Sequence, residues 1–355
     1  MKTKMISFFL LSALFLVSCG GREQKDVATK TPKIQVLPDT AASRVDILID
    51  GKLFTAFLYT DTLPALTKPV LWPVISAAGD TLTRGFPLHP VAGERSDHPH
   101  HIGLWFTYGD VNHIDFWGNS PAMPPEMHDK LGWIRNVKIL KTESGDDQGT
   151  LEYTADWHDA HGKVMLKEHT LLTFGDGRDT RTIDRVTTLT AQQDTIVFYD
   201  TKEGMMAIRV THALELPSDK PSTFTDEHGN VTVVGGSNDT IARADYLTSE
   251  GITGKEAWGK RAVWVCLHGK VNGTEESITI FDHPGNPGHP TYWHARGYGL
   301  FSVNPLGQKT FSKGKEVLNL TLAPGESVTF RYRVLIKSGT VTAEEINKEY
   351  EQYSK

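Results

Sequence analysis

Apolar and polar residues alternate with a period of two over much of this sequence, and that pattern constrains the fold more than any other feature. It is clearest over residues 151–157 and 328–334, where every second residue is apolar. In residues 44–59 two apolar runs flank Asp50-Gly51, a pair that favours a tight hairpin turn. Because successive side chains of a strand point to opposite faces, the alternation predicts half-buried β-strands.

Further strand-like runs follow one another along the chain, separated by turn residues. They occupy residues 164–174, 180–189, 195–199, 205–211, 231–234, 277–281 and 317–322. A succession of strands without intervening helices predicts an all-β fold, a large antiparallel β-sandwich, rather than alternating β and α units. We see no repeat and no internal linker, so we expect one domain over residues 39–355.

One helix is expected, at the C-terminus. Thr342 and Glu345 have the spacing of a capping box, in which each side chain bonds a backbone amide at the start of the helix. Ile346, Tyr350 and Tyr353 then recur at helical spacing. The pattern predicts a short amphipathic helix docked on the body of the domain.

The N-terminus has the pattern of a bacterial export signal. Lys2 and Lys4 precede an apolar run over residues 5–17, and Ser18-Cys19 follows. The sequence Leu-Val-Ser-Cys resembles the lipobox of bacterial lipoproteins, in which the Cys carries the lipid anchor. We therefore expect a signal peptide over residues 1–18, a lipid on Cys19 and a flexible tether over residues 19–38. The alternative is a plain secretory signal with an incidental Cys.

This interpretation places the protein in the bacterial cell envelope, at the periplasm or the outer-membrane surface, attached to the membrane through its lipid only. Cys266 is then the only other cysteine, in an apolar stretch, and we expect a buried strand thiol rather than a nucleophile. The chain has 37 Lys and Arg against 43 Asp and Glu. That acidic balance argues against a nucleic-acid partner, which usually requires a basic excess.

The histidines gather in two loops that also contain Pro, Gly, Trp and Arg. Six of the fifteen lie in residues 98–101 and 283–294. Pro and Gly fix a backbone path, and polar side chains on such loops suit a site for a small polar molecule. Aromatic rings stack on sugar faces while Asn and Asp pair with hydroxyls, so we expect a sugar or oligosaccharide as ligand. The predicted binding residues are Asp97, His98, Trp105, Asn112, Asp115, Trp117, Arg209, Asp282, Asn286, His294, Arg296 and Asn304.

Two readings of these residues stay open. Trp105 and Trp117 could instead belong to the core of the sandwich. His98, His100 and His101 could bind a transition metal, because imidazole is a good ligand for Zn, Cu or Fe. Pro99 disrupts a regular strand there, however, and no nearby Glu or Cys completes a recognised spacing. No cofactor is predicted, and the metal is kept as an alternative.

Glu203 is the candidate base. It lies in Lys202-Glu203-Gly204 between two apolar runs, where the edge of a sheet or a cleft would partly desolvate it. Desolvation raises the pKa of a carboxylate toward the range that is useful for proton transfer. Arg209 could instead pair with Glu203 and make it structural.

Several motifs together resemble the soluble PmoA-like proteins, a bacterial family common in polysaccharide-degrading species. In chain order they are residues 98–105, 109–112 with 115–117, 202–204, 282–287, 293–296, and 298–301 with 304–305. The resemblance implies a β-supersandwich related to the galactose mutarotases and a carbohydrate context. It does not imply methane oxidation, since no membrane helix beyond the signal is expected. By analogy with mutarotase-like enzymes, Glu203 would be the base and His101 or His283 the acid.

Two functions from different classes follow. The first is an exported enzyme that acts on a sugar or oligosaccharide by acid–base chemistry, as a lyase, epimerase or glycosidase, with the predicted residues in one cleft. The second is a glycan-binding module without turnover. A His-ligated, metal-dependent enzyme is a third reading.

Overall fold

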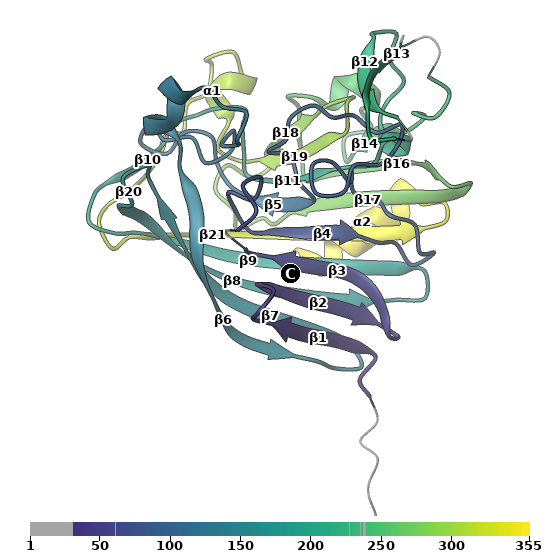
Figure 1. Cartoon of the computed structure of the whole chain (residues 1–355), viewed down its shortest axis with the longest axis horizontal. Coiled ribbons are helices and arrows are strands. Elements are labelled where there is room, and N and C mark those ends of the chain that lie inside the picture. The colour runs from purple at the N-terminus through teal and green to yellow at the C-terminus, as the bar shows by residue number, and fades with distance from the viewer. Residues whose placement is uncertain (1–30, 61, 227, 235, 237–238) are drawn as a thin grey trace, which may run out of the picture. The chain divides into compact units, whose positions relative to one another are not determined.

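The computed structural model describes residues 31–355, apart from residues 61, 227, 235, 237 and 238, and residues 32–355 form one compact unit. Within this part of the chain two large antiparallel sheets dominate (Figure 1). No helix among the described residues has the length and apolar character needed to cross a membrane. The predicted fold class, a large antiparallel β-sandwich with a short C-terminal helix, is confirmed.

The first sheet has nine strands in the order β1-β2-β3-β4-β5-β11-β19-β18-β15. Their bounds are β1 Ile34–Asp39, β2 Arg44–Ile49, β3 Lys52–Leu58, β4 Val70–Val74, β5 Leu104–Phe106, β11 Met206–Arg209, β19 Leu300–Asn304, β18 Thr291–Ala295 and β15 Arg261–Ala262. The second sheet has eight strands in the order β14-β16-β17-β21-β9-β8-β7-β6. Their bounds are β14 Asp245–Thr248, β16 Trp264–Val271, β17 Thr274–Asp282, β21 Ser327–Ser338, β9 Thr180–Ala191, β8 Val164–Asp176, β7 Gln148–His158 and β6 Trp133–Glu143.

Two small antiparallel pairs and a few short helices complete the described part of the fold. The pairs are β10 Ile196–Phe198 with β20 Leu320–Leu322, and β12 Ser222–Thr225 with β13 Val231–Val234. The helices are η1 Pro125–Lys130, η2 His212–Leu214, η4 Gly254–Ala257, α1 Gln308–Phe311 and α2 Ala343–Tyr353.

The main core lies between the two sheets, where the apolar residues of the period-two pattern meet. In β7 and β21 the residues that alternate in the sequence also alternate between buried and partly exposed. The expected hairpin forms between β2 and β3, with Asp50 at φ 48° and Gly51 at φ 74°. Positive φ at both central residues is what a turn matched to the twist of the strands requires.

Helix α2 begins at the predicted capping box and covers part of the second sheet's outer face. The hydroxyl of Thr342 accepts a bond from the amide of Glu345, and the Glu345 carboxylate accepts one from the amide of Thr342. Ile346 of the helix packs in a cluster with Cys266 of β16. Cys266 is fully buried there, and burial raises the pKa of its thiol to about 12, which confirms the interpretation as a strand thiol.

Two boundaries differ from the sequence prediction. Strand β1 includes residues 34–38, which were assigned to the tether, because Ile34 and Val36 alternate into the core and pair with β2. In the run 317–322 only residues 320–322 form a strand. The carboxylate of Asp200 accepts the amides of Leu318 and Asn319 at 2.9 and 2.7 Å, so these residues form a loop instead. The signal peptide, Cys19 and the rest of the tether lie outside the described residues.

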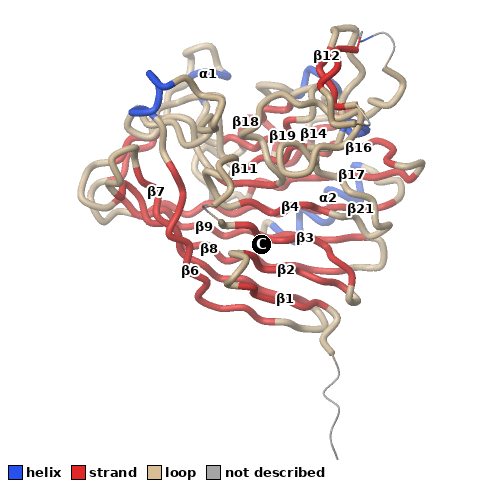
Figure 2. Tube along the Cα trace, in the orientation of Figure 1, coloured by secondary structure: helices blue, strands red, loops and turns tan. Residues whose placement is uncertain are grey.

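The outer face of the first sheet carries a second, smaller apolar cluster. In β5, Leu104 and Phe106 face the main core, while Trp105 between them joins Ala207 of β11 and Leu300 of β19 on the opposite side. Figure 2 shows that loops gather over β11, β18 and β19, whereas the part around β1 to β3 is mostly strand. The sheet therefore offers one face to the core and another to these loops.

A buried polar network lies on the core face of the second sheet. Glu168 of β8 accepts bonds from Tyr153 and Trp157 at 2.8 Å each, and from Arg185 at 2.7 Å. Its side chain is 1% exposed and that of Arg185 is 10% exposed. With the carboxylate in place, the donors around it are satisfied without water.

We expect Glu168→Ala to lower the free energy of unfolding by about 3–5 kcal/mol, because it leaves Arg185 charged, buried and without its carboxylate. Urea unfolding followed by fluorescence measures this. Glu152→Ala is the matched control, since that glutamate on β7 forms a partly exposed pair with His169 and its loss should cost less than about 1 kcal/mol. Equal effects of the two substitutions would contradict the role of the network.

Candidate active site

The candidate site lies on the outer face of the first sheet. Pairing across four adjacent strands places Trp105 of β5 beside Ala207, Ala207 beside Ser302, and Ser302 beside His294 of β18. Arg209 lies two residues after Ala207 in β11 and therefore shares its face. The sheet thus brings three predicted residues from distant parts of the sequence, Trp105, Arg209 and His294, onto one surface.

Two buried arginines fix the first histidine loop. The side chain of Arg209 is 0% exposed and that of Arg84 is 1% exposed, and both donate to Oδ1 of Asp97, at 2.6 and 2.9 Å. Arg84 also donates to the carbonyl oxygens of His98 and His101, at 2.9 and 3.1 Å. Burial alone would raise the pKa of Asp97, but the hydrogen bond from His98 and the two arginines hold it well below its usual range.

The histidine rings of this loop stack in a row. His98 lies parallel to His101 on one side and to Tyr298 on the other, with centroids 5.0 and 5.2 Å away. His101 in turn stacks on Trp105 at 5.3 Å. Gly103 follows at φ 60°, and a Cβ there would lie 2.2 Å from the carbonyl oxygen of Leu71, so the loop can enter β5 only with glycine at this position.

Burial keeps two of these imidazoles neutral. It lowers the pKa of His100 to about 3, helped by the positive charge of Lys68, and it lowers that of His101 well below 6.5. The His101 Nε2 and Trp105 Nε1 atoms are buried and have no hydrogen-bond partner among the described residues. Trp105 and Trp117 are 1% and 2% exposed, and they pack in the smaller apolar cluster on the outer face of the first sheet, not in the core between the two sheets.

Glu203 lies beside His294. Its Oε2 is 3.7 Å from Nδ1 of His294, and the side chains are 27% and 2% exposed. On its other side the carboxylate forms an ion pair with Lys202. Gly109 permits this position, because its amide donates to the Glu203 carbonyl at 2.8 Å and a Cβ on it would lie 2.7 Å from the Glu203 Cβ.

The alternative in which Arg209 pairs with Glu203 is wrong, because Arg209 pairs with Asp97. Glu203 is therefore a partly exposed carboxylate between a lysine and a histidine. Burial, together with the charges of Lys202 and Arg296, lowers the pKa of His294 to about 3. The ring is neutral near pH 7, and its Nδ1 donates to the carbonyl oxygen of Lys202 at 2.9 Å. Nε2 is then the acceptor of this ring.

A cavity of about 530 Å³ is lined by Ala295 and Arg296, the two residues that follow His294 in the chain. Its walls include Trp258, Arg296 and Tyr298. The Trp258 ring lies 6.5 Å from that of His294. Tyr298 stacks on His98 at 5.2 Å, and burial raises the pKa of its hydroxyl. Tyr298 thus connects the histidine loop and the cavity.

The second histidine loop is only partly in this site. His283 packs edge-on against Tyr353 of α2 at 5.5 Å, and its Nδ1 accepts the amide of Gly285. Asp282 is fully buried and bonds His289 and Asn286 at 2.7 and 2.8 Å. Within the described chain none of these contacts joins Glu203, so the structure does not bring His283, Asp282 and Asn286 together with the candidate base.

Three further predicted residues hold loops in place. The side-chain amide of Asn112 donates to the carbonyl oxygen of Thr195 and accepts the backbone N–H of Val197, which fixes the Asn112 loop to β10. Asn304 donates to the carbonyl of Thr201 at 2.9 Å, just before Glu203. Asp115 accepts the amides of Trp117 and Gly118, and burial raises its pKa. Asn304 and Asp115 lie near Glu203 and support its surroundings.

Sequence reasoning missed three residues of the site. Arg84 and Lys68 lie before the motifs, in stretches without other polar clustering. Lys68 donates to the carbonyl of His100 at 3.1 Å, and burial lowers its pKa to about 8. Trp258 follows η4, far from the other motifs. Only the packing of the sheet reveals these three.

The alternative hypothesis is that His98, His100 and His101 bind a transition metal. Among the described residues, no three side chains of His, Cys, Asp or Glu are placed as a metal-binding group. His98 and His101 lie parallel to each other, and the ring of His100 lies edge-on to both. The metal alternative stays a prediction.

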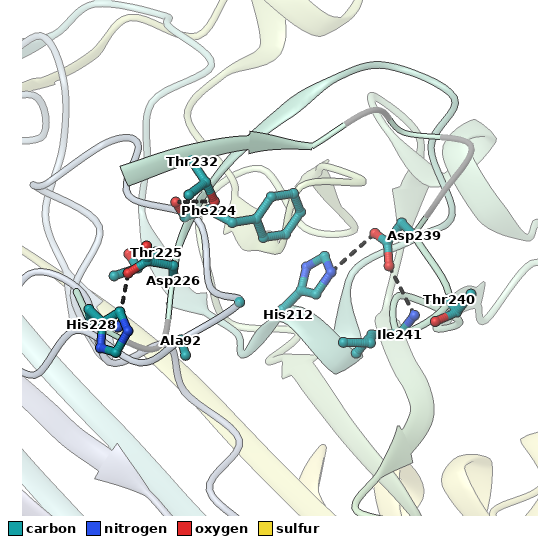
Figure 3. A pocket seen from close by; sticks show the side chains of 11 residues that line it. Ala92, His212, Phe224, Thr225, Asp226, His228, Thr232, Asp239, Thr240 and Ile241 are labelled. Atoms are coloured by element: carbon teal, nitrogen blue, oxygen red, sulfur yellow. Dashed lines mark hydrogen bonds and ion pairs between the residues drawn. The ribbon is translucent and has the colours of Figure 1, made fainter. Parts of the chain in front are cut away.

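A different cavity, of about 430 Å³, contains a histidine that the sequence analysis did not select. Burial alone would lower the pKa of His212, but the carboxylates of Glu215 and Asp239 raise it, at 3.2 and 3.1 Å from the two ring nitrogens. Figure 3 shows His212 facing Asp239, which also accepts the amide of Ile241. Each ring nitrogen lies within ion-pair distance of a carboxylate, so this histidine connects its own loop to that of Asp239.

The chain matches one known protein family. The sequence profile of the family of unknown function DUF6807 matches residues 44–351. The chain belongs to this family. No curated protein sequence matches it. The resemblance to the PmoA-like proteins, drawn from the motifs, stays a prediction.

Solved structures similar to this DUF6807 protein include three carbohydrate-related ones. The galactosidase domain of the alpha-galactosidase-sucrose kinase AgaSK is 10% identical, with a TM-score of 0.37, over 86% of this chain and 42% of that one. A putative aldose 1-epimerase from Escherichia coli K12 is 12% identical, with a TM-score of 0.34, and the match covers 86% of this chain and 99% of that one. A galactose mutarotase-like protein from Clostridium acetobutylicum is 11% identical, with a TM-score of 0.37, and the match covers 87% of this chain and 100% of that one. The chain spans less than half of the AgaSK chain.

The neutral, buried histidines predict a stability that decreases in acid. In the unfolded chain His294 takes up a proton near pH 6.5, whereas in the folded protein its pKa is about 3. Below about pH 6.5 the unfolded state therefore binds more protons, and this residue lowers the free energy of unfolding by up to about 1.4 kcal/mol per pH unit. Urea unfolding at several pH values should show a shallower dependence in His294→Gln.

The control is His161→Gln, which removes an exposed imidazole from a turn. It should keep the wild-type pH dependence, because solvent surrounds that ring in the folded and the unfolded chain. An unchanged slope in His294→Gln would mean that His294 is not held neutral in the folded protein.

Proposed function

We propose that this protein is an enzyme that acts on a sugar or oligosaccharide by acid–base chemistry, with Glu203 as the base. The observation that carries the proposal is the pairing of Glu203 with a neutral His294 whose ring packs against Trp258, an aromatic wall of the cavity. Trp258 and Tyr298 offer ring faces for a sugar, and the partly exposed Glu203 is accessible to it. A carboxylate beside such a cavity fits proton abstraction better than a purely structural role.

The neighbours of Glu203 have separate roles in this proposal. Nε2 of His294 accepts a bond from a sugar hydroxyl, since Nδ1 is engaged by the backbone. The ammonium of Lys202 stabilises negative charge that develops on a sugar oxygen. His101, predicted as the acid, is neutral and 2% exposed, and its acid role stays a prediction.

Glu203→Gln tests the role of the base. It preserves the shape of the side chain and removes the proton acceptor, so we expect kcat on a responsive oligosaccharide to fall by at least about a hundredfold, with Kd changed by less than about threefold. A screen of neutral and acidic oligosaccharides by mass spectrometry identifies the substrate, and calorimetry measures binding. The control is Glu126→Gln, on the exposed helix η1.

A wild-type activity that survives Glu203→Gln would refute the proposed base. A protein that binds glycans and changes none of them would support the second candidate, a glycan-binding module. The observation that favours this second candidate is the same pair of aromatic cavity walls, which serves binding as well as catalysis.

We further propose that the protein is exported and anchored by a lipid on Cys19, as the lipobox-like sequence predicts. Mass spectrometry of the mature N-terminus, after expression in a Gram-negative host, should find a lipid-modified Cys19 in the membrane fraction. Cys19→Ser should abolish the lipid and release the protein from the membranes. An unmodified Cys19, or cleavage elsewhere, would refute the anchor.

A further inference from the structure

We propose that the cavity lined by Trp258 and Arg296 binds the acidic group of the ligand, a carboxylate or a sulfate ester, so that the natural ligand is an acidic sugar. The inference rests on the proposed function and adds the class of substrate. We call this cavity of about 530 Å³ the basic cavity, because its lining includes Arg95, Lys220, Lys255 and Arg296, together with Trp258 and Tyr298.

The charges of the basic cavity are unbalanced. Asp219 is the single acidic residue among its lining residues, against four cations. Arg95 is neutralised by Glu215 at 2.5 Å. Among the described residues Lys220, Lys255 and Arg296 have no carboxylate within ion-pair distance. Unpaired cations converging on a concave surface attract an anion and raise its local concentration.

Arg296 has the geometry of an anion receptor. Its guanidinium carbon lies 5.5 Å from the Tyr298 ring and 6.0 Å from the Trp258 ring. Contact with these rings holds the side chain in place while its N–H groups can donate to two oxygens of one anion. The indole N–H of Trp258 is buried and has no hydrogen-bond partner among the described residues, so a donor is left over in the same wall.

The basic cavity and the catalytic pair share walls. The ring of Trp258 packs edge-on against that of His294 at 6.5 Å, and Ala295 and Arg296, which follow His294 in the chain, line the cavity. A sugar ring whose acidic group meets Arg296 would therefore present neighbouring positions toward Glu203. Aromatic faces for the ring and cations for its acidic group are complementary to an acidic sugar, whereas a neutral sugar leaves the cations unused.

Calorimetry with matched ligands tests the inference. The probes are trigalacturonate and its methyl ester, which share the same rings and differ in charge, and a sulfated galactose trisaccharide with its desulfated form. We expect at least one acidic probe to bind at least about tenfold more tightly than its neutral match, with an affinity that falls as salt rises. The trigalacturonate and sulfate arms distinguish the two sources of the anion.

Arg296→Gln should lower the affinity for the acidic probe by about tenfold or more and leave the neutral probe within about twofold. Lys255→Gln, at an exposed residue, should give a smaller loss of the same kind. The control, Arg178→Gln, removes an exposed arginine in the β8–β9 turn and should change neither affinity.

Several results would overturn the inference: equal affinity for the acidic and neutral probes, equal losses for both in Arg296→Gln, or no binding of any acidic probe at millimolar concentration. These results are separable from failure of the proposed enzyme. Turnover of neutral sugars that depends on Glu203 but not on Arg296 would leave the function standing without the acidic ligand. Tight binding of acidic sugars without any turnover would leave the ligand class standing without the enzyme.

Discussion

Two guanidinium groups buried against one carboxylate organise the functional face of this protein. Arg84 and Arg209 are almost completely removed from solvent, and Asp97 is the anion that both contact. A buried cation is costly unless a partner and hydrogen bonds compensate it. Arg84 meets that requirement by also bonding backbone carbonyls of the histidine loop. The path of this loop, and with it the stacked rings of His98, His101 and Tyr298, therefore depends on the pair of arginines.

In the first sheet, one face packs in the main core and the opposite face carries the candidate site, because successive side chains of a strand point to opposite sides. Leu104 and Phe106 enter the main core, and Trp105 between them faces the site. The same holds in β11, where Met206 and Ile208 face the core and Ala207 and Arg209 face the loops. Because the core face holds the strands rigidly, residues on the other face are positioned by the sheet rather than by loops.

Local patterns allowed much of the fold to be predicted. The Asp50-Gly51 turn and the capping box at Thr342 depend on neighbours in sequence, and both form as expected. The site was predictable only in part. Its motifs include Trp105, Arg209 and His294, which the sheet brings onto one surface, but also His283, which packs against α2. A motif indicates that a residue type is unusual at its position without stating which surface the residue faces.

The sequence by itself determined that this chain forms antiparallel strands and where the hairpin and the helix lie, because period-two alternation, turn residues and caps act over a few residues. Tertiary structure alone decided which carboxylate pairs with which cation. Arg209 contacts Asp97, more than a hundred positions away, and not Glu203 nearby, because pairing with β5 and β19 directs its side chain to the histidine loop. That choice leaves Glu203 beside Lys202 and His294, with its side chain partly exposed.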